Sequence, residues 1–301
     1  MAKTLIVITG PTGVGKTSTG IEIARHFGTE IISADSRQIF KEMRIGTAVP
    51  KKMELATVKH HFIQTHSIHD NYNASRFEFE ALNLLQQLFR KYDVVLMVGG
   101  SMLYIDAVCN GIDLMPDVDM EIRCRLKDQI ASEGIESLRM QLKKLDPEYY
   151  FQVDLKNPNR SVHALEVCLT TGKPYSSFRS NRKKKRPFSI LKIGLRRDRE
   201  KLHERINQRV DKMLEHGLEK EAKTLYKYKE LTALNTVGYR ELFSSFDNEI
   251  SREKAIELIK RNTRRYARKQ LTWFRKEPEI HWFNPGETGN IIQFTENKIE
   301  R

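Results

Sequence analysis

The sequence predicts an α/β protein, with a P-loop core built on a doubly wound parallel sheet and a helical insertion domain. Three observations lead to this prediction. Short apolar segments alternate with helical segments through residue 115, a glycine-rich motif follows the first apolar segment, and helix follows helix from residue 116 onward. Alternation of buried strands with helices is typical of a parallel sheet covered on both faces.

The core elements follow from the pattern in chain order. LIVIT is a buried strand, and residues 16–27 continue as a helix. EIISAD is a second strand, residues 77–90 carry apolar side chains at helical spacing, and DVVLMVGG is a further strand. Because ligands of such sheets bind at the carboxyl ends of the strands, we expect GPTGVGKT, ADSRQ and GGSMLY to form the site.

The segment after residue 115 has a different character. Helical stretches at 120–134, 135–145 and 161–171 are separated by the breakers DP, NP and TGKP. The run RSNRKKKRP, residues 179–187, is highly charged, and we expect a solvated loop. Strand character returns at FSILKIGL, and a long helix follows at 199–215. The sequence therefore predicts a catalytic core of residues 1–115 and 188–301, with an insertion at 116–187.

Composition limits the class of protein. Of the 301 residues, 39% are hydrophobic and 30% are charged, as in soluble globular proteins. The longest apolar stretches are too short to cross a bilayer, so we expect no membrane association. The three cysteines form no C-x-x-C pair, which argues against a zinc site or a disulfide scaffold. These features favour a protein of the reducing cytoplasm.

The net charge of +13 is unevenly distributed. The first 115 residues carry a net charge of +1, and the remaining residues carry +12. Such a basic half is typical of proteins with a polyanionic partner such as nucleic acid. Lysine and arginine on solvated helix faces would explain it equally well.

The glycine-rich motif GPTGVGKT matches the phosphate-binding pattern G-x-x-x-x-G-K-[ST] in full. Its glycines allow successive backbone N–H groups to point at an anion, and the following helix adds its positive end. We expect Lys16 to contact the terminal phosphate and the Thr17 hydroxyl to bind magnesium. The pattern does not say whose phosphates are bound. The candidate phosphate ligands are Gly10, Pro11, Thr12, Gly13, Val14, Gly15, Lys16 and Thr17.

The position of the nearest carboxylate argues against a motor or switch NTPase. Those enzymes normally place an Asp at the end of a buried strand to hold magnesium, but DVVLMVGG is followed by Ser101. The acid comes instead after EIISA, as Asp35. There it could bind magnesium, act as a general base, or simply stabilise a turn. The function classes that remain are small-molecule kinases and other transferases that use a diphosphate substrate.

The C-terminal segment NTRRYARKQLTWFRK interleaves basic and aromatic side chains. On a helix it presents Arg264, Arg268 and Arg275 on one face. Tyr266, Gln270 and Trp273 lie on another. This arrangement suits a nucleic-acid backbone with stacked bases, although the aromatics could equally pack in the core. The adjacent His60 and His61 are expected to be structural.

A family resemblance narrows the choice. In order, the chain contains GPTGVGKT, DSRQIF, IGTA, GGSMLY, NPNRSVHALEV with TGKP, INQRVDKMLEHGL, VGYREL and TRRYARKQLTWFR. Together they resemble the tRNA dimethylallyltransferases, also called tRNA isopentenyltransferases, of the bacterial type. The resemblance covers residues 5 to about 283, and it rests on the order and spacing of the motifs rather than on any single one.

The resemblance implies a reaction. The phosphates would belong to dimethylallyl diphosphate, and the acceptor would be N6 of the adenosine 3′ of the anticodon. Asp35 would be the general base, and Ser101 would be a second catalytic residue whose hydroxyl bonds the acceptor nucleotide or the diphosphate. Lys16, Thr17 and a Mg²⁺ ion would stabilise the departing pyrophosphate. Arg209, or alternatively Arg205, is expected to be a second diphosphate ligand.

The resemblance also implies a tRNA surface, and we expect a monomeric enzyme. The insertion and the C-terminal arginines would hold the anticodon stem-loop. Three departures from the family pattern stand out: Ser101 replaces Thr, Lys156-Asn157 replaces Asn-Asp, and His163 replaces Arg. The expected tRNA contacts are Asp35, Ser36, Arg37, Gln38, Ser101, Arg123, Asn159, Arg160, Ser161, Val162 and His163.

Three alternatives remain at the level of sequence. An isopentenyltransferase for free adenine nucleotides would need neither the helical insertion nor the basic C-terminal helix. A P-loop kinase for a small metabolite would bind ATP and transfer its γ-phosphate. A non-catalytic, ATP-dependent RNA-binding module would not need Asp35.

Overall fold

The computed structural model describes residues 3–299 except 114, 117, 181 and 182. The chain forms two compact units. The first comprises Met1–Asn110 and Lys185–Arg301, and the second comprises Gly111–Lys184. No helix within the described residues is long and apolar enough to cross a membrane.

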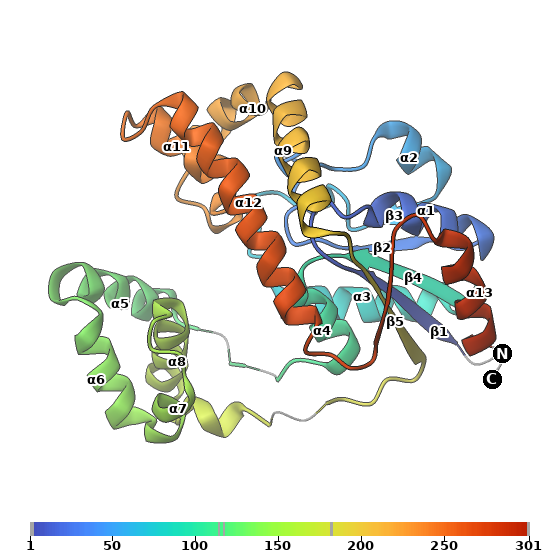
Figure 1. Cartoon of the computed structure of the whole chain (residues 1–301). Coiled ribbons are helices and arrows are strands. Elements are labelled where there is room, and N and C mark those ends of the chain that lie inside the picture. The colour runs from blue at the N-terminus through green and yellow to red at the C-terminus, as the bar shows by residue number, and fades with distance from the viewer. Residues whose placement is uncertain (1–2, 114, 117, 181–182, 300–301) are drawn as a thin grey trace. The chain divides into compact units, whose positions relative to one another are not determined.

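The first unit is built on a parallel sheet, as Figure 1 shows. Its described strands lie in the order β3-β2-β4-β1-β5-β6, and every pairing is parallel. The central strands β1 and β4 are buried along their whole length. The predicted doubly wound α/β core is confirmed. The strands are β1 (Thr4–Thr9), β2 (Ile31–Ala34), β3 (His60–His61), β4 (Val94–Gly99), β5 (Ser189–Leu195) and β6 (Ile280–Phe283).

Helices cover both faces of this sheet. Phe77 and Leu85 of α3 pack in one apolar cluster with Val95, while Ile23 of α1 and Ile206 of α9 pack in another. A third cluster lies among the helices from α9 to α12. The helices of this unit are α1 (Lys16–His26), α2 (Lys52–Thr57), α3 (Ala74–Leu88), α4 (Met102–Asn110), α9 (Arg199–Glu215), α10 (Leu218–Leu225), α11 (Tyr239–Phe246), α12 (Arg252–Phe274) and α13 (Thr288–Ile299).

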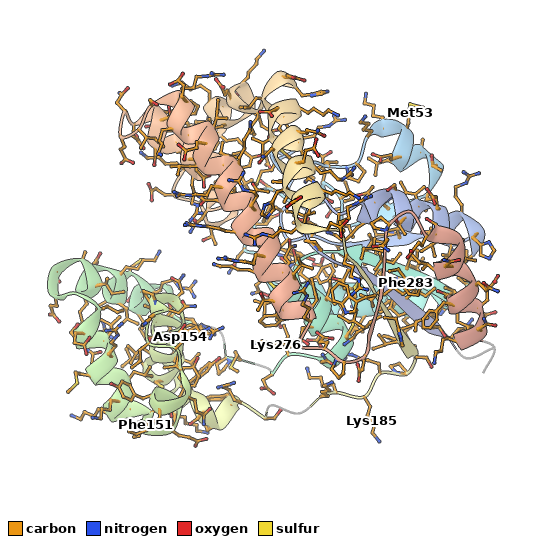
Figure 2. All side chains as sticks on the ribbon, in the orientation of Figure 1. Met53, Phe151, Asp154, Lys185, Lys276 and Phe283 are labelled. Atoms are coloured by element: carbon orange, nitrogen blue, oxygen red, sulfur yellow. The ribbon has the colours of Figure 1, made fainter. Side chains whose placement is uncertain are left out.

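The second unit is helical and has its own core, in which Leu126, Leu138, Leu142, Tyr149 and Leu165 are buried. Local sequence determines where its helices begin and end. Asp119 and Asp146 cap the first turns of two helices, Pro158 begins a third, and Gly172 ends it with φ +68°. The helices are α5 (Met120–Glu133), α6 (Ile135–Leu145), α7 (Pro147–Gln152) and α8 (Pro158–Thr171). Phe151, which is 76% exposed, projects from α7 (Figure 2).

The expectation of a solvated loop at 179–187 was wrong for Arg186. Its side chain is 8% exposed and forms an ion pair of 2.7 Å with Glu78. It also donates hydrogen bonds to the carbonyls of Ala107 and Val108, at 2.7 and 2.8 Å. Those carbonyls belong to the last turn of α4, where no helical N–H group can reach them. Residues 181 and 182 of the same run lie outside the described part of the chain.

Candidate active site

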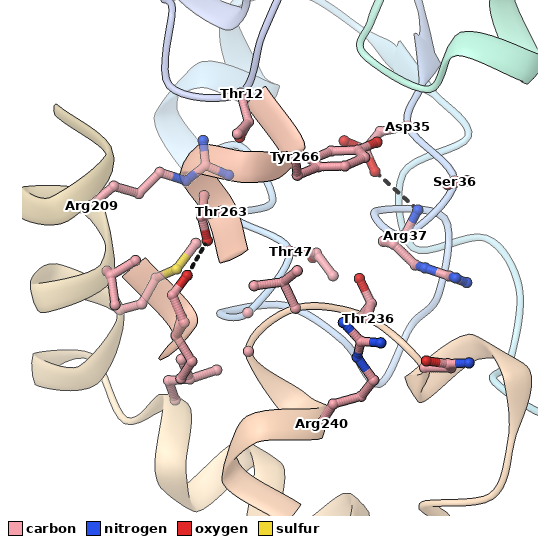
Figure 3. A pocket seen from close by; sticks show the side chains of 18 residues that line it. Thr12, Asp35, Ser36, Arg37, Thr47, Arg209, Thr236, Arg240, Thr263 and Tyr266 are labelled. Carbon is pink, nitrogen blue, oxygen red and sulfur yellow. Dashed lines mark hydrogen bonds between the residues drawn. The ribbon is translucent and has the colours of Figure 1, made fainter. Parts of the chain in front are cut away.

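A cavity of about 410 Å³ opens beside the carboxyl ends of β1 and β2. Thr12 of the phosphate loop, Asp35 and Arg37 of the loop after β2, and Arg209 of α9 line it (Figure 3). Tyr266 of α12 lies across from Asp35 in the same view. Parallel strands bring these loops to one edge of the sheet, as the sequence predicted for GPTGVGKT and ADSRQ.

The phosphate loop has a backbone that requires glycine. Gly10, Gly13 and Gly15 have φ values of +142°, +79° and +119°. A Cβ atom on Gly10 would lie 2.5 Å from the Leu195 carbonyl oxygen of β5. Helix α1 begins directly after the loop at Lys16, so its unpaired N–H groups and positive dipole end face the loop. The loop therefore has the conformation of an anion cradle.

Residues distant in sequence brace this loop. Arg197, just after β5, donates its Nε–H to the Val14 carbonyl at 2.8 Å. Because the N–H of a trans peptide points away from its C=O, this bond turns the Gly15 N–H away from Arg197. Gln270 accepts from the Thr12 N–H at 2.8 Å and donates to the Gly100 carbonyl at 2.8 Å. It therefore links the phosphate loop to the end of β4.

The sequence analysis did not identify Arg197, and it assigned Gln270 only to a helix face. Arg197 could have been found from its place directly after a predicted strand. The bracing contact of Gln270 depends on how α12 packs against the sheet, which the local pattern does not show.

Lys16 interacts with the charges of both Asp35 and Arg209. Its Nζ donates to the Gly10 and Pro11 carbonyls, each at 2.9 Å. Burial lowers the pKa of Lys16 to about 8; the charge of Asp35 opposes this shift, and that of Arg209 adds to it. Lys16 is thus a cation at neutral pH that a bound polyphosphate would stabilise further.

Asp35 lies at the point where β2 ends. Its Oδ1 accepts hydrogen bonds from the N–H groups of Arg37 and Gln38, at 2.9 and 3.2 Å. Among the described residues no hydrogen bond engages Oδ2. The carboxylate therefore stabilises a turn through one oxygen, and its other oxygen takes no part in this hydrogen-bonded turn.

Ser101 connects the loops after β4 and β2. Its hydroxyl, on a side chain only 7% exposed, accepts from the Ser36 N–H at 2.8 Å and donates to Ser36 Oγ at 3.1 Å. Nearby, burial raises the pKa of Tyr266 to about 12, and the charge of Asp35 adds to the shift. The Tyr266 phenol therefore stays protonated at neutral pH.

The two arginines proposed as diphosphate ligands occupy different places. Arg209 lines the cavity, where burial lowers its pKa and the charge of Asp35 opposes that shift. Arg205 is exposed one turn away, and its Nε–H donates to the Gly13 carbonyl at 3.0 Å. Only Arg209 faces the cavity, while Arg205 braces the loop.

The far wall of the cavity was not predicted from the sequence. It combines apolar and polar side chains that come from α9, α10, α11, α12, the segment before α11 and the loop that contains Thr47. This wall depends on the packing of helices far apart in sequence. The apolar members are Val210, Met213, Leu218, Val237 and Ile259, and the polar members include Thr47, Asn235, Thr236, Arg240 and Thr263.

The remaining expected tRNA contacts lie in the second unit. Arg123 forms a bidentate pair with Glu166 through bonds of 2.6 and 2.9 Å, and His163 Nδ1 lies 3.5 Å from the same carboxylate. Asn159 and Arg160 are exposed on the first turn of α8 and Val162 is half-buried. Ser161 is fully buried, so its hydroxyl does not reach the surface of this unit.

The remaining candidate metal ligands are the histidines, cysteines and carboxylates. Among the described residues, no group of three or more His, Cys, Asp or Glu side chains is arranged to hold a metal ion. His60 Nδ1–H donates to the Val58 carbonyl at 2.7 Å, and His61 Nε2 contacts Glu30 at 2.5 Å. Both histidines are thus engaged in contacts within and beside the short strand β3.

Comparison with known proteins agrees with this geometry. The IPP transferase family matches residues 38–277. The chain is 52% identical over 299 residues to tRNA dimethylallyltransferase 1 of Bacteroides fragilis, covering 99% of each chain. It is 55% identical over 300 residues to tRNA dimethylallyltransferase of Christiangramia forsetii, again covering 99% of each.

Solved structures agree as well. The full-length tRNA isopentenylpyrophosphate transferase of Bacillus halodurans is similar with a TM-score of 0.73 and 34% identity, covering 99% of this chain and 97% of that one. A eukaryotic dimethylallyltransferase acting on tRNA has a TM-score of 0.77 and 27% identity, covering 94% and 74%. The resemblance found in the motifs is confirmed: the chain belongs to the tRNA dimethylallyltransferase family.

Proposed function

We propose that this protein transfers the dimethylallyl group of dimethylallyl diphosphate to N6 of the adenosine 3′-adjacent to the anticodon of tRNA, releasing pyrophosphate. One observation carries the proposal. A single cavity is lined by the Asp35 carboxylate, by Arg209 beside Thr12 of the phosphate loop, and by an apolar wall; these groups suit proton removal, diphosphate binding and prenyl binding.

The phosphate loop would bind the diphosphate. Its backbone N–H groups, Lys16 and Arg209 supply positive charge where the C–O bond of the substrate breaks. The donor set also fits magnesium. The Thr17 hydroxyl would be one ligand, and phosphate oxygens and water would be the others. Such a set suits Mg²⁺, which proteins often hold mainly through the phosphates of the bound substrate. Bound there, Mg²⁺ would neutralise charge on the leaving pyrophosphate.

Asp35 would remove the proton. The N6 amine of adenine is a weak nucleophile because its lone pair is delocalised into the ring. As N6 bonds to the allylic carbon and the C–O bond breaks, its extra proton passes to Asp35 Oδ2. The two backbone N–H groups on Oδ1 hold the carboxylate in place during this step. The Ser101–Ser36 contact holds the adjacent loop.

The apolar wall would bind the five-carbon chain. Val210 and Met213 of α9 and Ile259 of α12 lie on the same cavity as Arg209. A dimethylallyl group that binds there is removed from water, which contributes a favourable free energy of about 25 cal/mol per Å² of buried apolar surface. This burial also keeps water away from the reactive allylic carbon.

The helical unit would support the RNA. Its exposed Asn159 and Arg160 and the half-exposed Arg123 are candidates for contacts with the anticodon stem, as proposed from the sequence. The target adenosine must leave the stacked loop to reach Asp35, which costs a few kcal/mol. Contacts between the helical unit and the anticodon stem would offset the free energy lost when the adenosine leaves the stack.

The decisive experiment offers the protein, with magnesium, unmodified tRNA and free AMP, together with dimethylallyl diphosphate or ATP. Nucleoside digestion and mass spectrometry identify the product. We expect an isopentenyl group on adenosine from tRNA alone. Modification of AMP without tRNA would indicate a nucleotide isopentenyltransferase, and consumption of ATP without prenyl transfer would indicate a kinase; either result contradicts the proposal.

A further inference from the structure

A second cavity, of about 440 Å³, lies between α9, α12 and the segment after β5. Seven arginines and His203 line it, and none of its described lining residues is acidic. Four of the arginines come from successive turns of α12, namely Arg261, Arg264, Arg265 and Arg268. We call this cavity the arginine groove. Its volume is in the range of small-ligand sites.

The arginines of this groove form no ion pairs with the carboxylates that the structure describes. Within the described part of the chain, none of the seven forms an ion pair; Arg264 donates instead to Asn207 Oδ1 at 2.6 Å. The buried Nε of Arg261 has no hydrogen-bond partner. Converging cations repel one another, so a groove of this composition is stabilised by an anion. The lowered pKa of His203, caused first by burial and then by Arg199 and Arg264, reflects the same positive potential.

The groove backs onto the phosphate loop. Arg197 lines the groove, and its Nε–H holds the Val14 carbonyl of the loop at 2.8 Å. Leu202 also lines the groove, and its Cδ1 lies 3.8 Å from where a Cβ of Gly13 would be. An anion in the groove and an anion in the loop would therefore be bound on two sides of the same short segment.

We propose that the arginine groove is a second phosphate site, which binds a free di- or polyphosphate anion. Pyrophosphate is such an anion, and its production beside the groove rests on the proposed function. Guanidinium groups suit this ligand, because each can donate paired N–H bonds to phosphate oxygens.

The lining favours a small anion over an RNA backbone. Proteins that bind single-stranded RNA combine basic residues with aromatic rings on which bases stack. No Phe, Tyr or Trp is among the described residues that line the groove. The aromatics of α12 lie elsewhere, since Tyr266 lines the first cavity and Trp273 packs against the sheet core.

The test is calorimetric titration of inorganic pyrophosphate, with magnesium and at physiological ionic strength. Lys16→Ala weakens the loop site, and Arg265→Gln with Arg268→Gln weakens the groove through two exposed residues. Lys269→Gln with Lys276→Gln is the control. It removes the same charge from exposed positions in the same region that do not line the groove (Figure 2).

We expect two binding events in the wild type and in the lysine control. Each site variant should lose one of them, with affinity falling about tenfold or more. A single event that Lys16→Ala removes and the groove variant leaves intact would overturn the groove and spare the proposed function. Two events that both survive Lys16→Ala would overturn the loop assignment instead. A groove variant that binds pyrophosphate normally but tRNA weakly would assign the groove to RNA and overturn the proposal.

Discussion

Under the proposed function, Asp35 has two roles in one side chain. Its Oδ1 accepts from the N–H groups of Arg37 and Gln38, which fixes the carboxylate relative to the end of β2. In the proposed reaction, its Oδ2 accepts the proton from N6. A residue that only stabilised the turn would be replaceable by any side chain that accepts the same two bonds.

This difference predicts the behaviour of Asp35→Asn. The amide oxygen can still accept the turn bonds, but the side chain cannot take a proton. We expect kcat to fall by about 10²–10⁴, with tRNA affinity within a few fold of the wild type. Single-turnover kinetics and a tRNA binding assay measure the two effects. Full activity of the variant would exclude Asp35 as the base.

The lowered pKa of Lys16 predicts that affinity for the diphosphate depends on pH. Because its pKa is lowered to about 8 in the free protein, the ammonium group is lost as pH rises through that value. Affinity for the diphosphate is therefore present below about pH 8 and declines above it. We expect kcat/KM for dimethylallyl diphosphate to show this alkaline limb. Lys16→Arg should move it to higher pH, since guanidinium stays charged; an unchanged limb in this variant would assign it to another group.

Arg209 and Arg205 provide a matched pair on α9. Arg209 faces the cavity, and Arg205 contacts the outside of the loop. Arg209→Ala should raise the KM for dimethylallyl diphosphate by about tenfold to a hundredfold, through loss of a charged hydrogen bond. Arg205→Ala should change it less. Steady-state kinetics of both variants test the assignment, and the reverse order of effects would exchange the two roles.

At the scale of elements, Glu221 of α10 holds a loop of the cavity in place. Its carboxylate accepts from the backbone N–H groups of Arg44, Ile45 and Gly46, at 3.0, 2.8 and 2.9 Å. The Tyr239 hydroxyl of α11 donates to it at 2.6 Å. The loop in turn contributes Gly46 and Thr47 to the cavity lining. One carboxylate thus ties two helices to a cavity wall.

Glu221→Ala should destabilise the protein. The substitution leaves three loop N–H groups without their acceptor, at a cost of roughly 2–4 kcal/mol in the free energy of unfolding. Glu219→Ala on the same helix is the control. Glu219 pairs with Arg252, which is 57% exposed, so its loss should cost about 1 kcal/mol or less. Urea unfolding measures both, and equal losses would show that the Glu221 contacts contribute little.

At the scale of the whole molecule, charge and chemistry are separated along the chain. The first 115 residues are nearly neutral and contain the phosphate loop, Asp35 and Ser101. The remainder carries +12 and contains the helical unit and α12. A basic surface raises the encounter rate with a polyanion and makes its affinity depend on salt.

Affinity for tRNA should therefore fall steeply with ionic strength. We expect log K against log salt to be linear, with a slope of about −0.7 to −0.9 for each phosphate contacted. Filter binding over a series of salt concentrations measures the slope. A flat profile would mean that the basic surface is solvated and does not bind RNA.

The sequence predicted the parts of the site that lie next to a strand end. The phosphate loop, Asp35 and Ser101 each follow a predicted strand within a few residues, and a parallel sheet places such ends along one edge. The sequence did not predict Arg197, Glu221 or Gln270 as supports. Arg197 and Val14 lie 183 positions apart, and Gln270 and Thr12 lie 258 apart. The error at Arg186 has the same origin, because Glu78 and the end of α4 become its partners only after folding.

By itself, the sequence determined the α/β class, the anion-binding loop and the family of this protein. Those properties depend on local backbone preference and on the order of short motifs, which the linear pattern contains. Only the tertiary structure decided which of Arg205 and Arg209 faces the cavity, which side chains form its apolar wall, and that seven arginines converge in one groove. The physical reason is that burial, pKa and ion pairing depend on distances between segments, and packing of distant helices determines those distances.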